Sequence, residues 1–240
     1  MYRLFFKRFF DVLFAILLLI PLAPIMLCVA IAIKLDSKGP AIFKQIRSGK
    51  NNKEFMLYKF RSMTCNNNIY DKSKEDQLTK VGSFIRKTSL DELPQLFNIL
   101  KGEMSFIGPR PWIVDYAKHF TDEQMRRLDV LPGITGLAQS SGRNAIGIID
   151  RINLDVEYVD NMSLLLDIKI IFKTVIGIIK KEGFSNTKSA IHEELKILEM
   201  QHTDMYKEEF NKNKLVKDKK HRTNKKKQRK EDKVLVGGGV

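Results

Sequence analysis

The sequence predicts a mostly helical α+β chain with an N-terminal re-entrant membrane helix, a small β element and interfacial amphipathic helices. Three observations support this fold class: an uncharged apolar run over 12–33, alternating aromatic and basic residues over 55–63, and leucines at helical spacing after residue 90. With 240 residues and 43% hydrophobic content, the chain can bury a sizeable core. We predict a membrane anchor over 1–35, a domain at the membrane surface over 36–202 and a basic, disordered tail over 203–240.

The apolar run over 12–33 is as long as a bilayer is thick, but two prolines interrupt it. As a straight helix it would span about 33 Å, against ~30 Å of hydrocarbon. Pro21 and Pro24 lie in its middle, where each removes an amide donor and favours a kink. Basic residues flank both ends, and the positive-inside tendency places both on one side. We therefore predict a re-entrant hairpin broken at the prolines, with a kinked span and a signal peptide as the alternatives.

The segment that follows the anchor predicts a strand and then a loop. Residues 55–63 (FMLYKFRSM) alternate so that a strand would present Lys59 and Arg61 on one face. Residues 66–76 are polar and rich in turn-forming types, which predicts a mobile loop.

The densest chemistry lies in residues 81–111. The apolar side chains from Leu93 to Leu100 recur at helical spacing, and Gly102 should end that helix. Because Pro94 belongs in a first turn, the helix should start near Asp91, although Ser89 and Glu92 also form a capping-box pattern. Either way, two adjacent carboxylates lie at a helix N-terminus, where the partial positive charge favours their ionised form. Favourable helix electrostatics alone would also explain them.

Arginines surround this acid pair in the sequence. Arg86 precedes it, and Arg110 follows between two prolines, where a fixed guanidinium could bind a phosphate with two hydrogen bonds. A rigid turn with a solvated arginine is the alternative. Glycines over 131–142 would allow close approach of a ligand, with Arg143 as another anion-binding candidate. No Walker A or G-x-G-x-x-G pattern is present, which argues against a P-loop or Rossmann site.

The C-terminal third combines an apolar segment with a strongly basic one. Residues 164–181 are apolar but interrupted by Asp167, Lys169 and Lys173, as in an interfacial helix, although an ordinary core helix is nearly as consistent. Residues 207–233 carry +8 of the net charge of +14. This tail could be a solvated end or an electrostatic tether to anionic lipids. Nucleic acid is not expected as a partner, because no aromatic residues interleave the basic ones after Phe210.

Taken in order, these segments resemble the small monotopic phosphoglycosyl transferases of the bacterial sugar transferase family. The likeness covers roughly three quarters of the chain and rests on a series: KRFFD before the proline-broken run, YKFRSM, RKTSLDELPQL, MSFIGPRP, LPGITGLAQ, GRNAI and LDVEYVDNMSLLLDIKII. One such motif is weak, whereas seven in order are highly specific. Larger relatives carry extra transmembrane helices in front of this unit, so the chain resembles the minimal catalytic form.

The resemblance implies that sugar-1-phosphate moves from a UDP-sugar to a polyprenyl (undecaprenyl) phosphate with release of UMP, as the first membrane step of glycoconjugate assembly. In this family the aspartate of the acid pair, here Asp91, is the nucleophile, and it forms a covalent aspartyl-phosphosugar intermediate. Mg²⁺ is the family's metal, which Asp91 and Glu92 would place, with proton handling as another role for Glu92. The candidates for holding phosphates and uridine are Arg110, Arg86, Arg61, Lys59 and Arg143.

The expected partners are therefore a UDP-sugar, a polyprenyl phosphate and anionic membrane lipids. The resemblance places the catalytic domain on the cytoplasmic face of the bacterial inner membrane. A membrane-tethered scaffold without catalysis, whose basic tail binds anionic partners, is the competing hypothesis. No motif in the sequence identifies the sugar.

Overall fold

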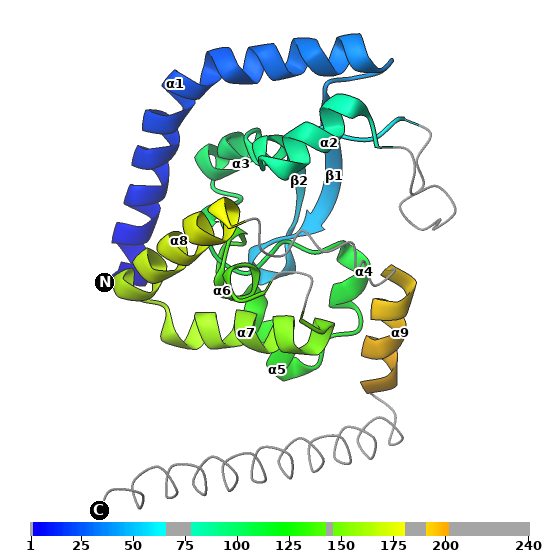
Figure 1. The fold of residues 1–240 in the computed structure, drawn as a ribbon. Coiled ribbons are helices and arrows are strands. Elements are labelled where there is room, and N and C mark those ends of the chain that lie inside the picture. Colours follow the sequence, from blue (N-terminus) through cyan, green and yellow to red (C-terminus); the bar gives the residue numbers. More distant parts are fainter. Residues whose placement is uncertain (1, 66–77, 143–145, 181–190, 202–240) are drawn as a thin grey trace, which may run out of the picture. The chain divides into compact units, whose positions relative to one another are not determined.

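The computed structural model describes residues 2–65, 78–142, 146–180 and 191–201 (Figure 1). Two compact units divide the chain, Met1–Leu195 and Lys196–Val240, and the site lies in the first. The loop predicted over 66–76 and the tail predicted over 203–240 lie outside the described residues. The helices of four or more residues are α1 Lys7–Asp36, α2 Lys80–Lys87, α3 Gln95–Lys101, α4 Val114–Ala117, α5 Asp122–Met125, α6 Leu137–Ser140, α7 Ile148–Asn161, α8 Leu164–Ile179 and α9 Ile191–Gln201; a five-residue π-helical segment, η1 Tyr2–Phe6, precedes α1.

The apolar run forms α1, a helix of 30 residues that contains both Pro21 and Pro24. Figure 1 shows that α1 changes direction sharply partway along its length, as expected where prolines remove amide donors. Within the described part of the chain, α1 is the one helix long and apolar enough to cross a membrane. Only 6% of its most apolar window is buried in the protein, unlike the core helix of a soluble domain.

The predicted strand is confirmed as β2 (Glu54–Phe60), which pairs antiparallel with β1 (Ile42–Ser48). The turn between them includes the short 3-10 helix η2 (Lys50–Asn52), and its two asparagines adopt left-handed backbone angles, which that residue type tolerates. Because β2 ends at Phe60, Lys59 lies within the strand and Arg61 beyond it.

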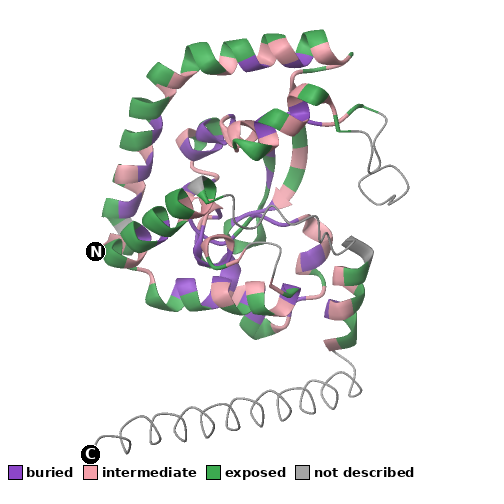
Figure 2. Ribbon diagram, viewed as in Figure 1, coloured by how far each residue is buried: buried purple, intermediate pink, exposed green. Residues whose placement is uncertain are grey.

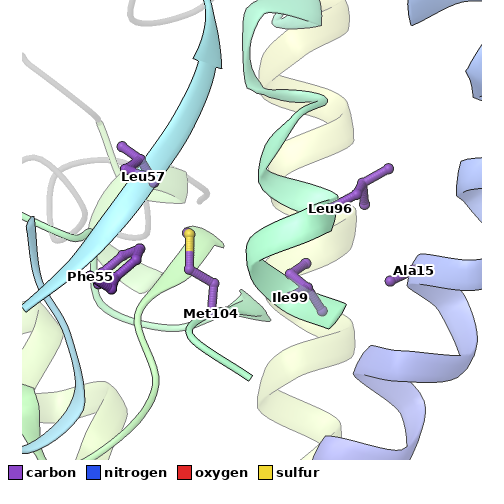
Figure 3. Packing of buried hydrophobic residues seen from close by; sticks show 6 residues of the cluster. All are labelled: Ala15, Phe55, Leu57, Leu96, Ile99 and Met104. Atoms are coloured by element: carbon purple, nitrogen blue, oxygen red, sulfur yellow. The ribbon is translucent and has the colours of Figure 1, made fainter. Parts of the chain in front are cut away.

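The core that positions the site joins α1, the hairpin and α3. Figure 3 shows Ala15 of α1 beside Ile99 of α3, while Phe55 and Met104 approach from the opposite side. The helix predicted after residue 90 is α3, and Gly102 ends it in the left-handed conformation with φ 85°.

A second, parallel pair of short strands, β3 (Ser105–Ile107) and β4 (Gly133–Thr135), lies next in the fold. Its neighbours are α7 and α8, whose buried residues Tyr158, Val159 and Ile170 pack with Ile107. Most apolar side chains of α8 are nevertheless exposed, as Figure 2 shows along that helix. Leu165 and Phe172, for example, retain 78% and 65% of their surface, so α8 is not an ordinary core helix.

Candidate active site

The acid pair lies in a tight turn between two helices. Thr79 caps α2 by accepting a hydrogen bond from the Gly82 amide, and Ser89 then reverses the chain with φ 57°. Leu90–Glu92 form one turn of 3-10 helix (η4), and Pro94 is the N-cap of α3, which begins at Gln95. The helix start predicted near Asp91 is therefore wrong, since the acid pair lies in the separate turn before α3. The capping box considered from the sequence is therefore not formed, because Ser89 is left-handed and makes no side-chain cap.

Two leucines of this turn hold it against the protein interior. Leu90 and Leu93 pack against a buried cluster that includes Ile33 of α1 and Ile85 of α2. Between them, Asp91 and Glu92 remain partly accessible. The turn thus presents two adjacent carboxylates from a backbone that is anchored on both sides of them.

Cations from three other elements surround the carboxylates. The Lys59 ammonium of β2 bonds to Glu92 Oε1 at 2.8 Å, and Arg110 Nη1 lies 3.8 Å from the same oxygen. Burial raises the pKa of the Asp91 carboxyl, Lys59 lowers that pKa, Glu92 raises it, and Arg86 and Arg110 lower it. The structure therefore brings together five of the residues that the sequence singled out.

Arg110 projects from a loop whose backbone is held firmly. The amide of Gly108 donates to the Thr135 carbonyl at 2.9 Å, and the Gly133 amide donates to the Pro109 carbonyl at 2.9 Å. A Cβ at Gly108 would lie 2.4 Å from the Leu131 carbonyl oxygen, so only glycine fits there. The Arg110 side chain itself keeps 47% of its surface and is free to meet a ligand.

The other three arginine candidates are placed differently. Arg86 is partly buried, its Nε donates to Ser62 Oγ at 2.7 Å, and burial lowers its pKa while Asp91 raises it. Arg61 is buried and donates to main-chain carbonyls at the end of α1, among them Ser37 at 2.7 Å. Lys59 and Arg61 thus serve different partners, and phosphate binding by Arg61 stays a prediction. Arg143 lies outside the described residues.

Both ends of α1 are bonded to the part of the chain that carries these residues. Near its start, Arg8 donates to the Ile99 carbonyl of α3 at 2.6 Å, and Asp11 accepts from Ser105 Oγ at 3.0 Å. Near its end, Asp36 Oδ2 accepts from the Val81 amide of α2 at 2.9 Å, next to the contacts made by Arg61. Polar bonds therefore tie each end of the apolar helix to the part of the chain that carries the acid pair.

One buried ion pair beside the site had no signal in the sequence analysis. Arg127 and Asp155 are each 1% exposed, and Arg127 Nη2 lies 2.6 Å from Asp155 Oδ2. The guanidinium also lies 4.5 Å from the centroid of Trp112. The two charges are 28 residues apart, so no local pattern connects them, and the aromatic cluster around Trp112 was the only available hint.

The carboxylates offer oxygen ligands of the type that Mg²⁺ prefers. Among the described residues, no group of three or more His, Cys, Asp or Glu side chains could hold a metal. Mg²⁺ is commonly bound by one or two carboxylates together with substrate phosphates and water, so Asp91 and Glu92 fit that mode.

Comparison with known proteins identifies the family. The model of the bacterial sugar transferase family matches residues 2–181. Sugar transferase EpsL of Bacillus subtilis (strain 168) is 47% identical over 183 residues, covering 75% of this chain and 91% of EpsL. UDP-glucose:undecaprenyl-phosphate glucose-1-phosphate transferase of Klebsiella pneumoniae is 45% identical over 192 residues, and undecaprenyl-phosphate galactose phosphotransferase of Salmonella typhimurium (strain LT2) is 40% identical over 198.

These two named transferases are much longer than the matched region. Each match covers 75% of this chain but only 41% of the relative. The region matched by the family model, residues 2–181, includes the acid pair, the Arg110 loop and all of α1 and α8. The chain belongs to the bacterial sugar transferase family.

Proposed function

We propose that the chain transfers sugar-1-phosphate from a UDP-sugar to undecaprenyl phosphate and releases UMP. The observation that carries this proposal is the partly buried Asp91 carboxylate, held in a fixed turn among Lys59, Arg86 and Arg110. Such an arrangement suits a carboxylate nucleophile that must meet a diphosphate, because the cations offset the charge of both. The names of the Klebsiella and Salmonella relatives describe the same class of transfer.

In the proposed first step, an Asp91 oxygen attacks the β-phosphorus of the UDP-sugar. The bond between that phosphorus and the bridging oxygen breaks, and UMP leaves with the bridging oxygen. An aspartyl-phosphosugar remains on the protein. In the second step, a phosphate oxygen of the lipid attacks the same phosphorus, forms the polyprenyl diphosphosugar and releases Asp91. Splitting the transfer lets each anionic substrate react in turn at one nucleophile.

The surrounding side chains support this chemistry by their charge. The Arg110 side chain is exposed enough to contact the diphosphate, while Arg86 lies near Asp91 on α2. Lys59 pairs with Glu92, and its positive charge offsets part of the repulsion between that second carboxylate and the anionic substrate. Asp91 and Glu92 would hold Mg²⁺, which when bound supplies neutralisation of the diphosphate charge.

We propose that α1 enters the membrane and returns to the same, cytoplasmic face. Its two ends are bonded to one scaffold, through Arg8 and Asp11 at one end and Asp36 at the other. A straight span would carry these ends to opposite faces, and a single compact domain could not bond to both. The exposed apolar side chains of α8 would then lie at the membrane interface, close to a lipid-borne acceptor.

The test uses the full chain in lipid nanodiscs with undecaprenyl phosphate, Mg²⁺ and a panel of UDP-sugars. Wild type should release UMP, and Asp91→Asn should lose at least ~10³-fold of that rate. Asp115→Asn is the matched control, because the Asp115 side chain keeps 42% of its surface and pairs with Lys118, the residue that follows α4. Retention of most UMP release by Asp91→Asn would reject the assignment of the nucleophile.

The intermediate and the sugar are tested in the same preparation. Without acceptor, wild type should gain the mass of one sugar phosphate, and Asp91→Asn should not. The relatives are named for glucose and galactose, so the panel begins with those two UDP-sugars. Cysteine labelling at both flanks of α1 tests the hairpin, since labelling from opposite sides would reject it.

A further inference from the structure

Arg127 makes three hydrogen bonds and contacts two aromatic rings, although it has no role in the proposed chemistry. It lies in the 3-10 turn η5 (Arg126–Leu128), directly after α5, and is 1% exposed. Its Nε and Nη2 both donate to Asp155 Oδ2 of α7, at 3.1 and 2.6 Å. Its Nη2 also donates to the main-chain carbonyl of Arg110 at 2.7 Å.

Aromatic rings fix the plane of this guanidinium. The Arg127 Cζ atom lies 4.5 Å from the ring centroid of Trp112 and 5.4 Å from that of Phe120. These rings lie 5.8 Å apart. A buried ion pair is stabilising only when its geometry is held well, and the rings together with α7 supply that constraint.

The loop that carries Arg110 depends on its carbonyl groups for attachment. Pro109 and Pro111 have no amide hydrogen, so two of the four backbone donors over 109–112 are missing. All four carbonyls accept bonds: Pro109 from the Gly133 amide, Arg110 from Arg127, Pro111 from Arg47 at 3.4 Å, and Trp112 from the Ser48 amide at 3.0 Å. The bond from Arg127 is the one that holds Arg110 itself.

We propose that Arg127, locked by Asp155 and Trp112, is a positioning residue that aims Arg110 at the substrate diphosphate. This inference rests on the proposed function. Arg127 is buried, and its hydrogen bonds go to Asp155 and to the Arg110 carbonyl, so it acts through the Arg110 peptide group. The Arg110 side chain, 47% exposed and 3.8 Å from Glu92, is the group that meets the ligand.

The expected effect is on substrate binding more than on turnover. Arg127→Lys keeps a positive charge for Asp155, but it loses the separate Nε bond to Asp155 and the planar group that lies on the Trp112 ring, so its ammonium is not held in one orientation toward the Arg110 carbonyl. Loosening one loop by about 1 Å should raise KM for the UDP-sugar ~10-fold and change kcat less. Asp91 and Lys59 lie on other elements, so the substitution of Arg127 should leave the nucleophile in its position.

The experiment is a double-mutant cycle between Arg127→Lys and Arg110→Met in nanodiscs. KM for the UDP-sugar and the Kd for UDP by calorimetry are both measured, so binding is read even if turnover fails. Arg126→Lys is the matched control, because this neighbour is exposed and pairs with Glu123 and Asp160 at the surface. It should leave both values unchanged.

If Arg127 acts through Arg110, the lysine variant should weaken UDP binding ~10-fold in the wild-type background and by less than about twofold beside Arg110→Met. Equal effects in both backgrounds, or none in either, would overturn the inference. No UMP release from wild type, with the UDP cycle intact, would reject only the proposed function. If Arg127→Lys does not fold, Arg127→Met with Asp155→Leu removes both buried charges and serves in the same cycle.

Discussion

Replacing Lys59 or Glu92, the two members of the ion pair beside Asp91, should shift the pH dependence of activity in opposite directions. Asp91 must be ionised to act as a nucleophile, and burial raises its pKa, so the acid limb of activity should lie above the ordinary aspartate range. The Lys59 charge lowers that pKa, and the Glu92 charge raises it. Lys59→Met should therefore move the acid limb to higher pH, and Glu92→Gln should move it to lower pH.

The size of the rate effect follows from the geometry of the pair. The Lys59 Nζ to Glu92 Oε1 distance is 2.8 Å, and the two side chains keep 19% and 20% of their surface. A hydrogen bond between charged groups contributes about 1.5–3 kcal/mol, and partial exposure favours the lower end of that range. At a pH above the acid limb, Lys59→Met should thus lower kcat/KM ~10- to 30-fold.

The assay is UMP release from pH 4.5 to 9 in nanodiscs at constant ionic strength. Lys53→Met, at the exposed turn of the same hairpin, is the control and should leave the profile unchanged. Movement of the limb in the same direction in both site variants would show that local charge does not set the Asp91 pKa. If the acid limb of the pH profile does not move in either variant, another group or another step limits the rate in acid.

Three further outcomes are expected. Lys7→Met should lower the free energy of unfolding by about 3–5 kcal/mol, because Lys7 lies 2.7 Å from Asp167 and the buried carboxylate would lose its counter-charge. Denaturant unfolding in detergent measures this change. A smaller loss of stability in the double variant Lys7→Met with Asp167→Leu would support that cause, and an equal loss would contradict it. Leu165→Ser with Phe172→Ser should weaken flotation with vesicles while leaving melting nearly unchanged, since both side chains are exposed. Truncation after Glu199 should keep UMP release within about twofold and reduce binding to anionic vesicles, whereas a scaffold acting through its tail would lose function.

Much of the local structure could be predicted because it depends on short-range rules. Proline spacing predicted the change of direction in α1, although the helix bends there without a break (Figure 1); alternation predicted β2, and Gly102 predicted the end of α3. The acid pair and Arg110 were found because their residue types, and the prolines around Arg110, already restrict what the chain can do there. These features need no knowledge of distant contacts.

What could not be predicted depends on residues far apart in the chain. Ser89 was a plausible helix cap by pattern, but the packing of Leu90 and Leu93 against α1 and α2 requires a reversal there. Arg127 and Asp155 meet only because η5 and α7 pack together. A buried charge pair has no periodicity, so its existence is a consequence of the fold and not of any local motif.

Arg61 shows how the anchor and the site are joined. Sequence alternation grouped it with Lys59, yet Lys59 bonds to Glu92 whereas Arg61 bonds to carbonyls at the end of α1, including Ser37. The two cations are two residues apart at the end of β2. The same backbone segment therefore carries Lys59, which bonds to Glu92 in the acid pair, and Arg61, which bonds to the end of α1. Movement of the C-terminal end of α1 should therefore affect the position of Lys59. If the proposed function holds, this linkage would set the position of α1 relative to the Asp91 carboxylate.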